Sequence, residues 1–129
     1  MMLVTDWEND YGFPMNIIKS AVACSGIYEL EPVRLSHRNT YLDLTEQSAR
    51  RNSSIRQIPE NDTPLTMAWG TGELPEFQRQ SHEFSVAWAA AGHTVDCFVL
   101  DGMHHFEVGR EIVNPNYPVL ANILKNMKV

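Results

Sequence analysis

The sequence is poor in positive charge, and this shortage limits the partners that the chain can have. Its 129 residues include 10 lysines and arginines against 16 aspartates and glutamates, for a formal net charge of -6. The basic residues are scattered, and the largest cluster is only Arg50 with Arg51. Nucleic acids and anionic membrane surfaces both require a positive patch that offsets phosphate charge. We therefore expect neither as a main partner.

Cysteines and long apolar runs are also scarce. Cys24 and Cys97 have neither metal-ligand spacing nor the density of a disulfide scaffold, and each lies in an apolar run, which favours two buried thiols. No apolar stretch approaches the roughly 20 residues that span a bilayer. The start, MMLVTDWEND, meets an acidic residue at Asp6 and lacks the basic and apolar regions of a signal peptide. These features predict a cytoplasmic protein that does not enter a membrane.

Three short apolar runs predict the strands of one sheet. They are SAVACS (20–25), which is followed by Gly26, PLTMAWG (64–70), which ends in glycine, and TVDCFVL (94–100), which is followed by Asp101. A short apolar run that stops at a turn-forming residue is typical of a buried strand entering a loop.

One amphipathic helix is clear between the second and third runs. Pro75 suits a first helical turn, where a missing N–H costs little, and Gly92 supplies a C-terminal stop. Five residues in between share one helical face: Phe77, Ser81, Phe84, Trp88 and Ala91. After the third run, FEVGREIV (106–113) and PVLANILKNM (118–127) predict two further helical pieces.

The remaining long segment, residues 28–62, is polar and irregular. It contains one weakly helical stretch, DLTEQSARR, which Thr45 is placed to cap. We interpret 28–62 as a lid-like excursion over the sheet. The order strand, excursion, strand, helix, strand, helix is typical of a parallel α/β sheet with right-handed crossovers. In such sheets the functional residues lie in loops beyond the carboxyl ends of the strands.

Two of those loops carry groups suited to acid–base chemistry. Glu73 and Glu76 follow the second strand, and His104 and His105 follow the third. A carboxylate beyond one strand can hold an imidazole beyond the next in one tautomer, which leaves the other ring nitrogen free to take a proton. Solvated loop residues would give the same pattern, so the residues alone leave both interpretations open.

A metal site is the alternative use of these side chains. His93, His104, His105, Glu73 and Glu107 could supply nitrogen and oxygen ligands. Adjacent histidines rarely share a metal, however, and neither H-x-x-E-H nor H-E-x-x-H occurs. We therefore predict no metal and no cofactor.

Three blocks resemble, in order, the arylformamidase branch of the α/β-hydrolase superfamily, the kynurenine formamidase-like esterases. The blocks are SGIYELEPVRLS (25–36), ELPEFQRQSHEF (73–84) and HHFEV (104–108). In that branch a strand ends in a Ser-Gly-hydrophobe-aromatic-acid turn, the triad acid comes two residues before Pro-Glu-Phe, and the triad histidine comes just before a phenylalanine. The resemblance extends from about Thr5 to Glu111. It implies that Glu73 is the triad acid and His105 the base.

The family's nucleophile is missing from these residues. The fold orders its triad as serine, acid and histidine, with the serine in a G-x-S-x-G elbow. Ser25 has a glycine after it but none two positions before it, and we interpret it as a turn residue that bonds the backbone. The resemblance places MMLVTDW just after the elbow helix, so we expect the serine and the oxyanion loop upstream of Met1. Residues 1–129 would then be the C-terminal portion of a single, truncated α/β-hydrolase domain, with about three strands and flanking helices.

Two functions follow from this interpretation. By family, the chain is a serine hydrolase-type esterase or formamidase for a small carboxylic ester or aryl formamide, inactive in isolation because the nucleophile and oxyanion donors are absent. The alternative is a non-catalytic binding or assembly module. Its first strand would expose an unpaired edge, which invites self-association.

Overall fold

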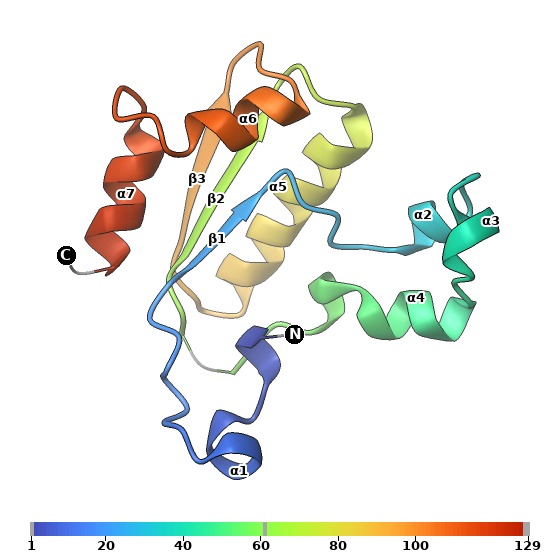
Figure 1. The fold of residues 1–129 in the computed structure, drawn as a ribbon, viewed down its shortest axis with the longest axis horizontal. Coiled ribbons are helices and arrows are strands. Elements are labelled where there is room, and N and C mark those ends of the chain that lie inside the picture. The colour runs from blue at the N-terminus through green and yellow to red at the C-terminus, as the bar shows by residue number, and fades with distance from the viewer. Residues whose placement is uncertain (1, 61, 128–129) are drawn as a thin grey trace.

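A three-stranded parallel sheet forms the centre of the molecule in a computed structural model that describes residues 2–60 and 62–127 (Figure 1). The strands are β1 (Ala21–Cys24), β2 (Leu65–Gly70) and β3 (Val95–Leu100). β2 lies in the middle, where it pairs with both neighbours in parallel. The prediction of three parallel strands with flanking helices is therefore confirmed.

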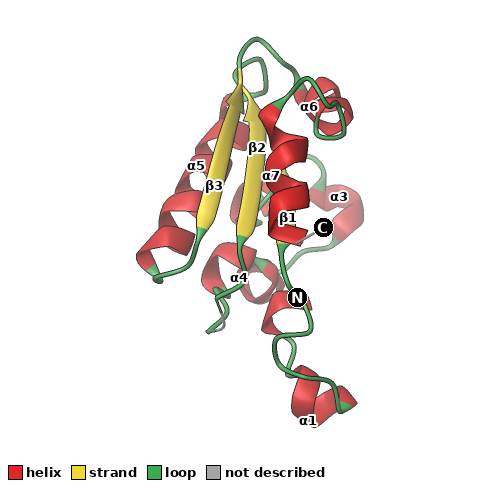
Figure 2. Ribbon diagram, turned by 90° about the vertical axis from the view of Figure 1, so that its left-hand side faces the viewer, coloured by secondary structure: helices red, strands yellow, loops and turns green. Residues whose placement is uncertain are grey.

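Helices cover both faces of this sheet (Figure 2). One face packs on α5 (Pro75–Ala90), and the other on α6 (His105–Glu111) and α7 (Pro118–Met127). Alternate side chains of a strand point to opposite faces, so Met67 belongs to the core under α5 and Ala68 to the core under α6 and α7. A central strand covered on both sides is buried along its whole length, which explains why the run at 64–70 is apolar at most positions rather than at alternate ones.

The helix α5 follows its sequence pattern closely. It begins at Pro75, and Gly92 beyond its end has a φ of 88°, in the left-handed region that glycine adopts without strain. Phe84 and Trp88 are buried on the expected face. Ala91 is exposed, because it lies one residue past the last helical turn as the C-cap.

The predicted excursion contains a set of short helices, within residues 31–56, at the side of α5 (Figure 1). They are α2 (Glu31–Arg34), α3 (Asn39–Leu42), α4 (Glu46–Asn52) and a 3-10 helix (Ser54–Arg56). Thr45 caps α4, accepting a hydrogen bond from the backbone N–H of Ser48 at 3.1 Å. Tyr28 anchors the start of the segment, where its ring stacks on Phe84 with 4.2 Å between ring centroids.

Two further short helices precede the sheet, a 3-10 helix (Met2–Val4) and α1 (Trp7–Tyr11). Asp6 caps α1 by accepting from the backbone N–H of Asn9 at 3.0 Å. No described helix combines the length and the apolar character that crossing a bilayer requires.

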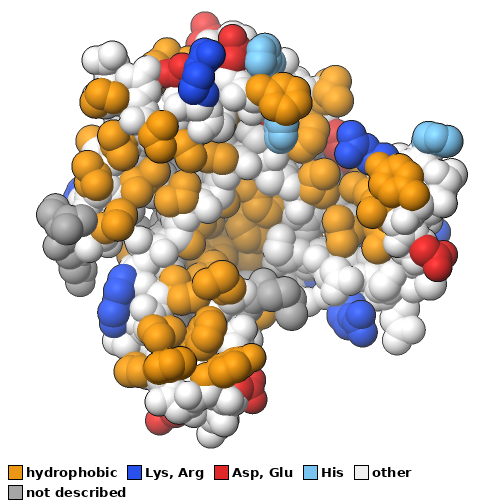
Figure 3. All heavy atoms as spheres, in the orientation of Figure 1, with side chains coloured by type: hydrophobic (Ala, Val, Ile, Leu, Met, Phe, Trp, Pro, Cys, Tyr) orange, Lys and Arg blue, Asp and Glu red, His pale blue; other side chains and the backbone are white. Residues whose placement is uncertain are grey.

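The outer strands are less covered than β2. Cys24 on β1 is half-buried and Cys97 on β3 is exposed, so the prediction of two buried thiols is wrong for Cys97. The error has a simple cause, because β3 is an edge strand and its apolar run faces solvent at alternate positions. Val22 of β1 is also exposed. Figure 3 shows hydrophobic side chains gathered around a hollow on the face seen in Figure 1.

Candidate active site

The loops after all three strands meet at the carboxyl edge of the sheet. The register pairs Cys24 with Ala68 and Gly70 with Leu100, so the residues that follow each strand lie close together. They border an open cleft with a volume of about 870 Å³. The cleft is lined by Ser25, Ile27, Arg38, Gly72, Glu73, Leu74, Phe77, His104, His105 and Phe106.

Glu73 and His105, the two residues singled out from the sequence, are in direct contact. Nδ1 of His105 lies 2.8 Å from Oε1 of Glu73. The Glu73 side chain is fully buried, whereas 45% of the His105 side chain is exposed in the cleft. A carboxylate at Nδ1 favours the tautomer with a proton on that nitrogen, so Nε2 is left as an acceptor. Phe77 packs against the imidazole with ring centroids 4.7 Å apart.

The second oxygen of Glu73 is also occupied. Ser25 Oγ donates to Oε2 at 2.9 Å, and the backbone N–H of Gly70 donates to the same atom at 3.1 Å. The interpretation of Ser25 as a turn residue bonded to the backbone is therefore wrong for its side chain, which bonds the acid. The sequence alone carried no signal for this bond, because it depends on β1, which Ser25 follows, lying beside β2, which precedes Glu73.

Glycines allow the loops after β2 and β3 to touch. A Cβ added to Gly70 would lie 1.9 Å from the carbonyl oxygen of Met103, and one added to Gly72 would lie 2.6 Å from that of Gly102. The backbone N–H of Gly72 instead donates to Met103 O at 3.0 Å. Thr71 Oγ1 accepts from the backbone N–H of Gly102 at 2.7 Å. These contacts fix Glu73 and His105 relative to each other.

The adjacent histidines have different environments. His104 is the N-cap residue of α6, and its backbone N–H donates to Oε2 of Glu107 at 3.0 Å. Its imidazole is 58% exposed and lies 3.6 Å from the same carboxylate oxygen. His105 is the first residue of the helix, and its ring turns to Glu73. Only His105 therefore pairs with a buried acid.

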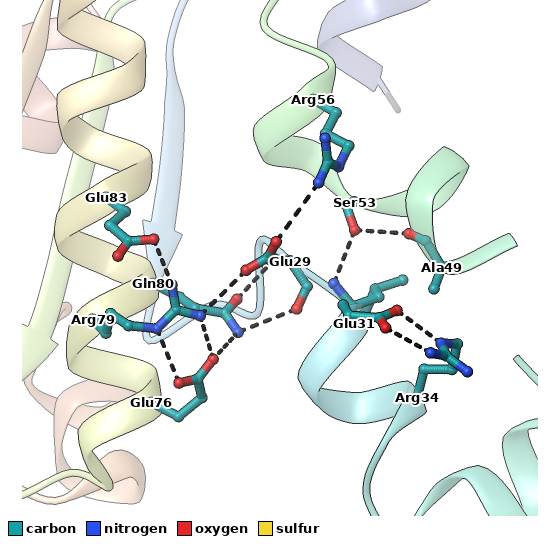
Figure 4. A network of polar contacts seen from close by, with 11 residues as sticks. Glu29, Glu31, Arg34, Ala49, Ser53, Arg56, Glu76, Arg79, Gln80 and Glu83 are labelled. Carbon is teal, nitrogen blue, oxygen red and sulfur yellow. Dashed lines mark hydrogen bonds and ion pairs between the residues drawn. The ribbon is translucent and has the colours of Figure 1, made fainter. Parts of the chain in front are cut away.

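The wall of the cleft formed by the segment after β1 is held to α5 by polar contacts (Figure 4). Gln80 Oε1 accepts from the backbone N–H groups of Tyr28 and Glu29 at 2.7 and 2.8 Å. Its Nε2 donates to Glu29 O at 3.1 Å and to Glu76 Oε1 at 2.8 Å. Arg79 bonds Glu76 and lies 3.3 Å from a Glu29 oxygen. Glu76 thus bonds within α5, whereas Arg79 also reaches the segment after β1.

The acid also affects a neighbouring thiol. Burial raises the pKa of Cys24 to about 11, and the charge of Glu73 adds to this shift. A raised pKa keeps this thiol protonated at neutral pH, so it is a poor nucleophile.

No set of three or more potential metal ligands gathers in the part of the chain that the structure describes. His93, considered with the cleft histidines as a ligand, lies elsewhere, with Nε2 2.7 Å from the carbonyl oxygen of Pro59. The cleft therefore brings together the carboxylate of Glu73 and the imidazole of His105, and His104 is also among its lining residues.

No family model matches this chain. A comparison with curated proteins, however, finds relatives that share one name. Kynurenine formamidase from Danio rerio is 33% identical over 130 residues, which cover 97% of this chain and 44% of that protein. The same enzyme from Salmo salar is 30% identical over 133 residues, with 98% and 45% covered. The chain thus spans less than half the length of the curated relatives it matches.

Two solved structures share the fold. A candidate thioesterase from a Silicibacter species superposes with a TM-score of 0.69 at 22% identity, covering 79% of this chain and 37% of that one. An α/β-hydrolase from the metagenome of Mar Chica lagoon sediments gives a TM-score of 0.56 at 18% identity, covering 86% and 52%. In each case the chain matches about half, or less, of the larger protein.

Proposed function

We propose that this chain corresponds to the C-terminal half of an arylformamidase-like α/β-hydrolase and that it supplies the acid and base of a serine hydrolase. The substrates are small carboxylic esters or aryl formamides. The observation that carries this proposal is the 2.8 Å contact between Glu73 and His105 at the edge of an open cleft.

In the proposed reaction His105 moves the proton and Glu73 orients it. Nε2 takes the proton of a serine hydroxyl as the serine oxygen attacks the carbonyl carbon, and Glu73 stabilises the resulting imidazolium through Nδ1–H. His105 then gives that proton to the departing alcohol or arylamine. A water molecule repeats the two steps on the acyl-serine, which releases the carboxylic acid and frees the serine.

The nucleophile is not Ser25 in this proposal. Its hydroxyl donates to Glu73 Oε2 rather than to the imidazole, and a serine nucleophile must deliver its proton to the base. No G-x-S-x-G occurs in the 129 residues. The serine and the oxyanion donors must therefore come from other residues, either in the same polypeptide or in a second one, and these 129 residues alone are inactive.

The apolar lining of the cleft supports the substrate class. Ile27, Leu74, Phe77 and Phe106 border the space next to the imidazole. An aryl or alkyl group on one side of the scissile bond would be buried against these side chains, while the carbonyl approaches Nε2 of His105.

Complementation tests this function. The chain is co-expressed with the part of Danio rerio kynurenine formamidase that it does not match, and hydrolysis of p-nitrophenyl acetate and of an aryl formamide is followed. We expect turnover only from the mixture, and a loss of about 1,000-fold or more in kcat for His105→Ala. His104→Ala is the matched control, with activity near that of the unmodified mixture. Turnover by the chain alone that disappears in Ser25→Ala would refute the assignment of the nucleophile.

A non-catalytic module is the second candidate, and it is favoured by the free edge of β1. Within the described residues β1 pairs only with β2, and Val22 and Ile27 at or near this edge are 43% exposed. An unpaired strand with apolar neighbours is a template for a further strand. A chain that forms stable oligomers, yet gives no active mixture with the complementary half, would support this candidate over the hydrolase.

A further inference from the structure

Ser25 has an unusual backbone for its residue type. Its φ is 47°, in the left-handed region that favours glycine, and only 5% of the residue is exposed. The residue is fixed there by the sheet, because its backbone N–H donates to Ala68 O at 2.9 Å and so extends the pairing of β1 with β2. Strained residues of this kind persist where the surroundings determine them, and they cluster at functional sites.

The strained backbone directs the Ser25 hydroxyl at the acid of the dyad. Glu73 Oε2 accepts two hydrogen bonds, one from Ser25 after β1 and one from Gly70 at the end of β2, while Oε1 faces His105. The side chain of Glu73 is fully buried, so no solvent is at hand to replace a lost donor. Donors from two different strands define the plane of the carboxylate, which one donor alone would leave free to rotate.

We propose that Ser25 is a positioning residue that acts through Glu73. Its hydroxyl holds the carboxylate so that Oε1 meets Nδ1 of His105, and this keeps the neutral imidazole in the tautomer whose Nε2 is free to accept a proton. The catalytic relevance of this role rests on the proposed function, but the effect on the tautomer does not. Two other roles for Ser25 predict different contacts, since a nucleophile would bond His105 and a turn residue would bond the backbone.

The test is ¹⁵N NMR of the His105 ring in the full chain, at a pH where the ring is neutral. Nitrogen shifts distinguish a protonated Nδ1 from a protonated Nε2. Ser25→Ala removes the hydroxyl and keeps the strained φ, whereas Ser25→Gly removes the hydroxyl and relieves the strain. Ser85→Ala is the matched control, because Ser85 is equally buried but donates to the backbone oxygen of His82.

We expect the Nδ1–H tautomer to dominate in the unmodified chain and in Ser85→Ala, and a mixture of tautomers in both Ser25 variants. An unchanged tautomer in a folded Ser25→Gly would overturn the proposal, as would an unmodified chain that carries the proton on Nε2. In the complemented enzyme, Ser25→Gly lowers kcat about tenfold with little change in KM, because the base is misoriented while the cleft is intact.

The ring measurement needs no substrate and no nucleophile. A shifted tautomer together with a mixture that never turns over would therefore count against the hydrolase function and leave the positioning role of Ser25 standing. An active mixture in which Ser25→Gly leaves the tautomer unchanged would support the hydrolase function and refute the positioning role of Ser25.

Discussion

The carboxylate of Glu73 is fully buried, and both of its oxygens have hydrogen-bond partners. Each of its oxygens has a donor: His105 at Oε1, and Ser25 with Gly70 at Oε2. Hydrogen bonds to an ionised carboxylate are stronger than neutral ones and offset part of the cost of removing it from water. The three partners come from the residue after β1, the last residue of β2 and the first residue of α6, so no oxygen of this buried carboxylate is left unpaired.

The loop after β3 passes so close to Gly70 that a side chain at this position would collide with it, and replacing Gly70 tests this requirement. In Gly70→Ala the new Cβ would meet the Met103 carbonyl at 1.9 Å, so one of the loops must move. We expect a loss of about 3 kcal/mol in the free energy of unfolding, measured by chemical denaturation. Gly109→Ala is the control, because nothing lies within 4 Å of its added Cβ and alanine favours a helix by about 0.5–1 kcal/mol. Equal midpoints for the two variants would contradict this account.

Cys24 provides a probe of the charge on Glu73. Because burial and that charge raise its pKa to about 11, little thiolate exists near pH 8, and the thiolate is the reactive form. We expect iodoacetamide to alkylate Cys24 roughly 100-fold more slowly than free cysteine at pH 8, with a rate that rises until the pH reaches about 11. Peptide mass spectrometry follows the reaction. In Glu73→Gln the pKa is lower and the reaction faster; a rate equal to that of free cysteine in the unmodified chain would disprove the shift.

At the scale of elements, the segment after β1 depends on a few polar side chains of α5. Gln80 is 2% exposed and uses both ends of its amide to bond the backbone of Tyr28 and Glu29 (Figure 4). These backbone groups are at the point where the chain leaves the sheet for residues 28–62. This buried amide is therefore one of the contacts that hold the cleft wall, beside the stacking of Tyr28 on Phe84.

Removing that amide should loosen the segment. Gln80→Leu has a similar volume but leaves two N–H groups and one carbonyl without partners, at a cost of about 1–3 kcal/mol for each group that stays buried. We expect faster hydrogen exchange at the amides of Tyr28 and Glu29, with β2 little affected. Val86→Leu, at an exposed position of the same helix, serves as the control. Unaltered exchange at both amides would rule out Gln80 as the anchor.

Gln80 also bonds the carboxylate of Glu76, and this contact makes the attachment of the segment dependent on pH. Hydrogen bonds from Arg79, then from Gln80, hold the pKa of Glu76 below its usual value. A lowered pKa in the folded state means that the added stability is present above about pH 4.5 and is lost as the pH falls through the folded value. We expect the thermal midpoint of Glu76→Gln to fall slightly below that of the unmodified chain at pH 7 and to converge with it near pH 3, the effect being small at a half-exposed site.

Glu60→Gln is the control for that titration, since its exposed carboxylate makes no hydrogen bond or ion pair in the described part of the chain. Its midpoint should follow that of the unmodified chain at every pH. A constant difference between Glu76→Gln and the unmodified chain from pH 3 to pH 7 would show that the carboxylate charge does not contribute.

Some elements were predictable from the sequence and others were not. The strands and α5 stand out because their apolar residues recur with the period of the element and glycine or proline marks the ends. The short helices α1, α2 and α3 have four or five residues each, too few for a period to be read. The site divides in the same way. Glu73 and His105 lie in recognisable motifs, whereas the bond from Ser25 to Glu73 spans 48 positions and depends on which strands are neighbours.

For the whole molecule, the free edge of β1 sets the expected behaviour in solution. On the side of β1 that faces away from β2, the backbone groups meet no further strand among the described residues, and Val22 on this strand is exposed. We expect the isolated chain to self-associate with increasing concentration in sedimentation velocity. Val22→Lys should reduce that association, because a charge on an edge strand opposes pairing. Val86→Lys places the same charge on α5 and should leave association unchanged; a concentration-independent monomer for the unmodified chain would refute the expectation.

The direct contacts between the loops after β2 and β3 have a further consequence for how a serine could complete the proposed triad. Because those loops bond each other directly and Ser25 follows the adjoining strand, the orientation of the His105 ring depends on residues at the ends of these three strands. In the proposed reaction, a serine brought by any other segment would meet an imidazole whose orientation is already set. Such a segment would only have to place its hydroxyl within reach of Nε2 of His105. We therefore expect that the segment carrying the serine could be exchanged between relatives without changes to the residues around Glu73.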